Sequence, residues 1–144
     1  MLIDVQNRFS NAQAITATAG STDIVDLGVA GRNIGVGEEM YLVVIVTTAF
    51  TDTGSDSTVA VTLETDDNTS MSSPTTILTL GTFAALSAAG TRFVVRLPVA
   101  TYERYIGVRY TVANGNLTTG AITAFLTKNP DAYTNYQNNY TFTT

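Results

Sequence analysis

The 144-residue sequence contains neither cysteine nor histidine. Without cysteine there is no disulfide framework, no thiol nucleophile and no thiolate metal site. Without histidine the usual general base, the Ser-His-Asp arrangement and the commonest zinc ligand are missing. Any catalysis would depend on carboxylates, tyrosines, arginines or the single lysine, Lys128. These absences favour a non-enzymatic protein without a cofactor.

Charge and long apolar runs are also scarce. Charged residues make up 13% of the chain and the net charge is −5, against roughly 25% charged residues in a typical domain. An acidic chain repels a phosphate backbone, so nucleic acid is not an expected partner. The longest apolar run, residues 40–46, is far shorter than a membrane span, and residues 1–10 do not resemble a signal peptide. We expect a soluble protein made in a cytosol, with no membrane partner.

Threonine is abundant, with 26 residues. It is β-branched and polar, which suits the solvent face of a sheet. A chain of this length is expected to form one domain. The composition predicts an all-β domain with large uncharged surfaces, which suit assembly.

Apolar residues alternate along eight short segments that are separated by turn residues, and no long helical periodicity is present. Eight antiparallel strands predict a sandwich, and the jelly roll is the commonest eight-stranded form. The glycine-rich stretch 28–39 is predicted to be a loop. The jelly-roll domain is assigned to residues 13–127. The expected strands are 13–19, 23–28, 40–50, 57–65, 75–81, 92–98, 104–112 and 121–127.

Two terminal segments fall outside this pattern. Residues 1–12 mix apolar and polar side chains and are predicted to form a short helix or an extended arm that lies on a neighbour. Residues 128–144 are rich in tyrosine, asparagine and threonine. Termini are often disordered, but aromatic side chains are costly to leave in water and tyrosine is well suited to interfaces. We therefore favour a C-terminal arm laid on a partner. Its aromatic residues are Tyr133, Tyr136, Tyr140 and Phe142.

Residues 52–54 spell Asp-Thr-Gly, the signature of aspartic proteases. That chemistry needs two aspartates that share a proton, so one copy in a short chain would require a homodimer. In retroviral proteases large aliphatic residues precede the motif and a Gly-Arg-Asn follows it. Here residues 49–51 are Ala-Phe-Thr, and the Gly-Arg-Asn at 31–33 comes before the motif. We interpret residues 51–57 as a polar hairpin loop.

Acidic residues in two loops raise the question of calcium, which takes oxygen ligands from such loops. The loops could meet at one end of a sandwich, but their spacing matches no calcium-binding loop, and acidic loops are usually solvated. The sequence leaves a bound calcium ion open. The residues concerned are Asp52, Asp56, Asp66, Asp67 and Asn68.

Four arginines fall on two consecutive expected strands, with two tyrosines nearby: Arg92, Arg96, Arg104, Arg109, Tyr102 and Tyr105. A basic aromatic face could bind an anion, a glycan or a single strand. An outward face paired with acidic residues, within the subunit or across an interface, fits the acidic chain better. The expected partner interface comprises Phe9, Arg92, Arg96, Tyr102, Tyr105, Tyr133, Tyr136, Tyr140 and Phe142.

Four runs resemble a known family: residues 7–28 (NRFSNAQAITATAGSTDIVDLG), 32–44 (RNIGVGEEMYLVV), 90–100 (GTRFVVRLPVA) and 104–127 (RYIGVRYTVANGNLTTGAITAFLT). They are similar to the cement, or capsid decoration, proteins of short-tailed bacteriophages related to the Bordetella phage. The resemblance covers roughly residues 2–127 and consists of these short sequence segments and their order along the chain. It includes no catalytic residues, and the segment 128–144 does not match.

This resemblance implies a dimeric jelly-roll subunit on the outer surface of an icosahedral shell of HK97-like major capsid protein. There it would clamp neighbouring capsomers, often at two-fold positions, after the shell expands. The expected location is the virion, with the host cytoplasm during assembly. A trimer stays possible for the isolated protein. The alternative is a jelly-roll receptor- or glycan-binding module of a head or fibre, with exposed stacking aromatics.

Overall fold

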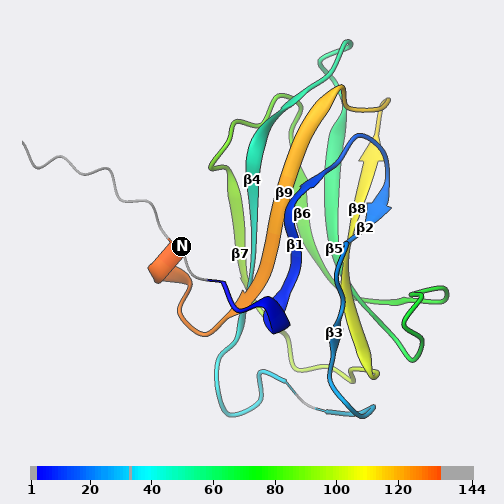
Figure 1. Ribbon diagram of the computed structural model, residues 1–144, viewed down its shortest axis with the longest axis vertical. Coiled ribbons are helices and arrows are strands. Elements are labelled where there is room, and N and C mark those ends of the chain that lie inside the picture. Colours follow the sequence, from blue (N-terminus) through cyan, green and yellow to red (C-terminus); the bar gives the residue numbers. More distant parts are fainter. Residues whose placement is uncertain (1–2, 33, 134–144) are drawn as a thin grey trace, which may run out of the picture.

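A computed structural model describes residues 3–32 and 34–133. Within these residues the chain forms nine strands and two 3-10 helices (Figure 1), and no helix has the length and apolarity needed to cross a membrane. The strands are β1 (Arg8–Ala14), β2 (Ala19–Gly20), β3 (Val25–Asp26), β4 (Tyr41–Thr51), β5 (Thr58–Asp66), β6 (Thr75–Phe83), β7 (Arg92–Arg96), β8 (Tyr105–Ala113) and β9 (Thr119–Thr127); the helices are η1 (Val5–Asn7) and η2 (Pro130–Tyr133).

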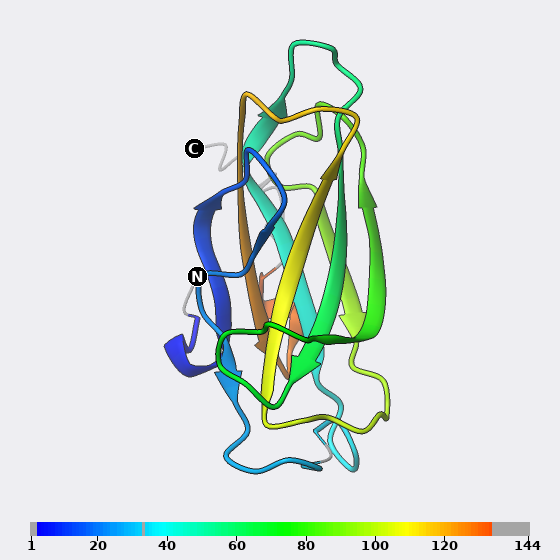
Figure 2. The same cartoon turned by 90° about the vertical axis from the view of Figure 1, so that its right-hand side faces the viewer.

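The strands form two antiparallel sheets. One has the order β1-β9-β4-β7 and the other β2-β8-β5-β6, with β3 also paired to β8. Because β2 and β3 both pair with β8, they are two halves of one interrupted edge strand. The eight resulting positions have the connectivity of a jelly roll, which confirms the predicted fold. Figure 2 shows the β2-β8-β5-β6 sheet face-on with the other sheet behind it, so that β8 (yellow) lies in front of β9 (orange).

The core lies between the sheets and follows from the alternation of side chains along each strand. The core residues of β4, β9, β5 and β8 are every second residue along each strand. In β9 the residues between them are buried as well, so both faces of this strand are covered. Burial of such aliphatic side chains is worth about 1.5–3 kcal/mol each. The central core residues are Leu42, Val44, Val46, Val59, Val61, Leu63, Ile106, Val108, Tyr110, Ile122, Ala124 and Leu126.

The N-terminal boundary differs from the prediction. β1 begins at Arg8, so residues 8–12 belong to the sheet, and Phe9 is fully buried in the core. β1 pairs with β9 through two register irregularities, and Ala12 has a φ of 46°. Bulges of this kind break the period-two pattern. For this reason residues 8–14 lack the alternation of apolar and polar residues from which a strand could be predicted.

An aromatic cluster fills one end of the core. Phe50 and Phe83 meet edge to face with ring centroids 5.9 Å apart, and Phe83 lies 4.3 Å from Phe93. Gly120 in β9 makes room for this cluster, because a Cβ there would lie 2.5 Å from Cδ1 of Phe50. The close approach requires glycine.

A buried polar contact joins the two sheets across the core. Oγ of Ser10 in β1 lies 2.7 Å from the hydroxyl of Tyr110 in β8. Ser10 Oγ also donates to Gln13 Oε1 at 2.7 Å. Burial raises the pKa of Tyr110 well above its usual range, so its hydroxyl stays protonated and available as a donor.

Candidate functional site

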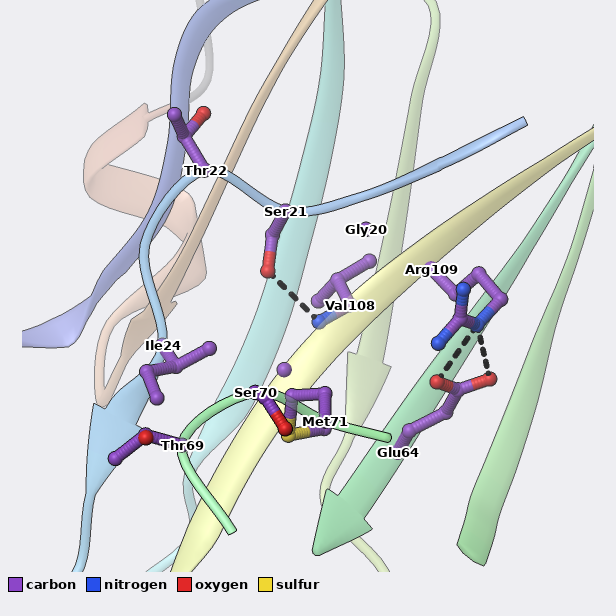
Figure 3. A pocket seen from close by; sticks show the side chains of 11 residues that line it. Gly20, Ser21, Thr22, Ile24, Glu64, Thr69, Ser70, Met71, Val108 and Arg109 are labelled. Atoms are coloured by element: carbon purple, nitrogen blue, oxygen red, sulfur yellow. Dashed lines mark hydrogen bonds and ion pairs between the residues drawn. The ribbon is translucent and has the colours of Figure 1, made fainter. Parts of the chain in front are cut away.

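A pocket of about 300 Å³ opens on the outer face of the β2-β8-β5-β6 sheet. Its walls come from the break between β2 and β3, from β5 and β8, and from the loop of residues 67–74 that follows β5. Glu64 and Arg109 lie on one side, Ser21 and Ile24 lie on the other, and Met71 lies between them (Figure 3).

An ion pair forms one wall of this pocket. Nε of Arg109 lies 2.9 Å from both Oε1 and Oε2 of Glu64. Thr62 Oγ1 donates to Glu64 Oε1 at 3.3 Å. The Glu64 side chain is 8% exposed and that of Arg109 32%. A buried carboxylate needs such partners, so Glu64 holds the guanidinium in a fixed position.

The loop of residues 67–74 is held over the sheet by Asp66. Its carboxylate accepts hydrogen bonds from the backbone N–H of Ser73 at 2.8 Å and of Asn68 at 3.0 Å. These bonds, that from Ser73 foremost, lower the pKa of Asp66. Met71 has a φ of 48°, and its Cε occupies space that a Cβ at Gly107 would approach to 3.1 Å. A side chain at position 107 would therefore displace the terminal methyl group of Met71.

Ser21 closes the gap between β2 and β3. Its backbone N–H donates to the carbonyl of Val108 at 2.7 Å, and its Oγ accepts from the N–H of Val108 at 3.1 Å. Ser21 Oγ also donates to the carbonyl of Asp23 at 2.8 Å. Where the edge strand is interrupted, the Ser21 side chain therefore accepts the hydrogen bond that a strand carbonyl would otherwise accept from Val108. These bonds hold this wall of the pocket in place.

A second candidate surface is the loop end, which consists of residues 28–32, 34–40 and 97–104. The two loops are joined by hydrogen bonds from Gly31 N to Tyr102 O and from Leu97 N to Met40 O, both 2.8 Å. Three valines of the loop end are more than half exposed: Val29, Val36 and Val99.

Most charges at and beside the loop end are paired, whereas Arg32 and Glu103 form no ion pair within the described residues. Arg104 binds Asp26 bidentately, with both distances 3.0 Å, and this hydrogen bonding lowers the pKa of Asp26. Arg96 lies 3.1 Å from Glu39, and Lys128 pairs with Glu38. The surface offers exposed aliphatic groups among charges that are mostly paired.

The four arginines do not share one basic face. β7, which carries Arg92 and Arg96, lies in the β1-β9-β4-β7 sheet, whereas β8, which carries Arg109, lies in the other sheet. The prediction of a common face was wrong because consecutive strands of a jelly roll can cross from one sheet to the other. Pairing with acidic residues within the subunit is seen for Arg96, Arg104 and Arg109.

Two residues of the expected partner interface are core residues instead. Phe9 and Tyr102 are fully buried, and the Tyr102 hydroxyl donates to the carbonyl of Pro98 at 2.8 Å. Neither can present a surface to a partner. Arg92 and Arg96 are exposed on β7, and Tyr105 is half-buried with its ring 5.0 Å from the Arg104 guanidinium carbon.

The aromatic residues of the expected C-terminal arm are only partly covered by the structure. Tyr133 is the last residue of η2. Tyr136, Tyr140 and Phe142 lie outside the described residues. Their place on a partner stays a prediction.

The two acidic loops lie far apart. Asp52 and Asp56 precede β5, whereas Asp66 and Asp67 lie at its end and just after it (Figure 1). A strand of this length spans about 30 Å, so a calcium site shared by the two loops is wrong. In the part of the chain that the structure describes, no three acidic residues gather into a metal-binding group.

The Asp-Thr-Gly triplet has the geometry of a capped loop. Asp52 Oδ2 accepts hydrogen bonds from the backbone N–H of Ser57 at 3.0 Å and of Asp56 at 3.2 Å. Hydrogen bonding from Ser57 in particular lowers the pKa of Asp52 to about 2. The ionised carboxylate of Asp52 therefore accepts hydrogen bonds from the backbone of its own loop. This agrees with the interpretation of residues 51–57 as a polar hairpin loop.

These features define a class of protein: a jelly-roll β-sandwich with a polar pocket on one sheet and an apolar loop end. A family model described as Bbp16 matches residues 9–126, which extend from β1 into β9. The chain belongs to the Bbp16 family, a phage-related family. No curated protein matches the chain.

Proposed function

We propose that this protein is a structural virion component that binds the outside of an icosahedral phage capsid. Its role would be to stabilise contacts between major capsid proteins of HK97-like fold, without catalysis or a cofactor. The observation that carries the proposal is membership of a phage-related family over residues 9–126. Because this match includes nearly the whole sandwich, the function belongs to the jelly roll itself. A dimer is the favoured form of the free protein.

The loop end supports the proposal as the contact surface. Burial of Val29, Val36 and Val99 removes exposed apolar surface from water, which favours contact with a partner. A single contact of this size is weak. Repetition by capsid symmetry and within a dimer would convert weak contacts into stable attachment.

The direct test uses purified shells that lack this protein. Adding it should raise the melting temperature of the shell, since a ligand that binds only the assembled state stabilises that state by mass action, by about 2.7 kcal/mol per site at a hundredfold excess over Kd. Cryo-EM of the same sample should show an added density of 15.3 kDa per copy on the outer surface. Equal melting temperatures together with a bare shell would refute the proposal.

A variant of the loop end tests the contact surface. Val29→Ser, Val36→Ser and Val99→Ser together should weaken binding to the shell at least tenfold, measured by co-sedimentation. The matched control is Leu86→Ser, which alters an exposed aliphatic side chain between β6 and β7, at the opposite end of the sandwich. It should bind like the wild type. Equal loss in both variants would contradict the assignment of the loop end.

A further inference from the structure

The pocket beside Glu64 has hydrogen-bond donors to spare. Arg109 uses Nε for Glu64, and among residues 3–32 and 34–133 its two terminal nitrogens have no hydrogen-bond partner. Within the same residues the hydroxyls of Thr69 and Ser70 make no hydrogen bond either, although both line the pocket. The acceptors are mostly engaged, because both oxygens of Glu64 and Oγ of Ser21 already receive N–H groups. The guanidinium nitrogens can only donate, whereas the two exposed hydroxyls can donate or accept, so the free groups together suit a ligand that accepts hydrogen bonds.

The site is also built in advance of any ligand. The buried Glu64 fixes the guanidinium, Ser21 fixes the edge, and Met71 adopts a backbone conformation that L-residues seldom adopt, packed over Gly107. Strained residues held in this way are concentrated at functional sites.

We infer that this pocket binds a carboxylate, presented as an acidic side chain by a segment of a partner protein. The two terminal nitrogens of a guanidinium form a planar fork that matches the two oxygens of a carboxylate. Met71 and Ile24 provide an apolar wall for the methylene groups of such a side chain (Figure 3). The volume of about 300 Å³ suits a side chain and is at the lower limit of small-molecule pockets.

The charge of the site predicts weak binding. Glu64 neutralises Arg109, so an added carboxylate gives the site a net negative charge. The guanidinium is also partly exposed, so water competes with the carboxylate for its hydrogen bonds. An isolated acidic side chain is therefore expected to bind in the millimolar range. The remaining affinity would come from the rest of the partner.

The same carboxylate chemistry occurs in acidic sugars, but the lining argues against them. No aromatic side chain is among the residues that line the pocket, so a sugar ring has no surface on which to stack. The pocket shares no residue with the loop end. The inference thus goes beyond the proposed function and would hold even if the protein bound no shell.

The test is an NMR titration of the full chain with N-acetylglutamate amide, N-acetylglutamine amide and glucuronate. The glutamate compound should produce saturable shifts at the Arg109 Nε–H, the Gly107 amide and the Met71 methyl group. The neutral glutamine compound should bind at least tenfold more weakly. Absence of saturable shifts, equal binding of the glutamine compound, or tighter binding of glucuronate would each overturn the inference.

Two variants assign the effect to the ion pair. Glu64→Gln with Arg109→Gln removes both charges together and leaves no unpaired buried carboxylate, and it should abolish the shifts. Arg109→Lys keeps the charge but lacks the fork, and it should weaken binding at least fivefold. Unchanged binding in the double variant would contradict the site. The wild-type comparison of the three compounds stays decisive if a variant fails to fold.

Discussion

At the scale of single residues, Asp52 shows what a carboxylate can contribute in an exposed loop. Its pKa is lowered from 3.8 to about 2 in the folded protein. A group whose folded pKa is depressed contributes stability above its unfolded pKa, and this contribution is lost as the pH falls through the folded pKa. The relevant window therefore runs from about pH 4 down to about pH 2.

Replacing Asp52 by Asn should lower the melting temperature at pH 7, because the two backbone N–H groups of the loop lose an ionised acceptor. The gap between wild type and variant should narrow as the pH is lowered from 4 to 2. Circular dichroism melting curves at several pH values measure this. Asp56→Asn is the matched control, since no hydrogen bond to the Asp56 carboxylate is found within the described residues. A gap that stays constant across the window would contradict the role of Asp52.

Glycine 120 is a residue whose missing side chain matters. A Cβ at this position would meet the ring of Phe50, which is buried and packed on Phe83. Gly120→Ala should lower the free energy of unfolding by about 1–3 kcal/mol, the usual cost of overpacking. Gly20→Ala is the control, because that position has open space around it, and it should cause no loss. Urea unfolding measures both, and equal effects would contradict the argument.

At the scale of elements, the two sheets are tied by the hydrogen bond between Ser10 and Tyr110. Tyr110→Phe should lower the free energy of unfolding by about 1 kcal/mol, since Ser10 retains Gln13 as a partner. Ser10→Ala should cost more, about 1–3 kcal/mol, because it leaves the buried tyrosine hydroxyl without a partner in the described residues.

The double variant Ser10→Ala, Tyr110→Phe should be more stable than Ser10→Ala alone, since no buried hydroxyl is then left unpaired. Denaturant unfolding of the four proteins completes the cycle and gives the coupling energy. Strictly additive losses would show that the contact between β1 and β8 contributes nothing beyond packing.

The positions of the strands can be predicted from the sequence more easily than the strands with which each one pairs. β4, β5, β8 and β9 follow from the alternation of apolar residues, and the jelly roll follows from their number. Membership of a sheet depends on contacts distant in sequence, which is why Arg92 and Arg109 were placed on one face although they lie on different sheets.

The pocket was harder to foresee. Its one visible signal is a glutamate, Glu64, in an outward row that otherwise holds threonine and alanine, with Arg109 on a later strand. Their pairing depends on the register of β5 against β8, in which Glu64 lies opposite Gly107. Nothing in the local sequence of either strand specifies that register.

At the scale of the whole molecule, the first and last strands are neighbours, and most pairings join distant segments. Such topologies must close long loops before contacts form, so folding should take milliseconds to seconds. Stopped-flow measurement of tyrosine fluorescence is suitable because the chain has no tryptophan. Folding within microseconds would contradict this expectation.

The pairing of Arg8 with Phe125 brings the start of β1 beside the end of β9. Both ends of the sandwich thus leave the molecule at one corner. A short linker could join them and the chain could be opened instead at residues 52–57, giving a circular permutant with the same sheets. For the same reason, one tag inserted just before β1 and another inserted just after β9 would lie close together.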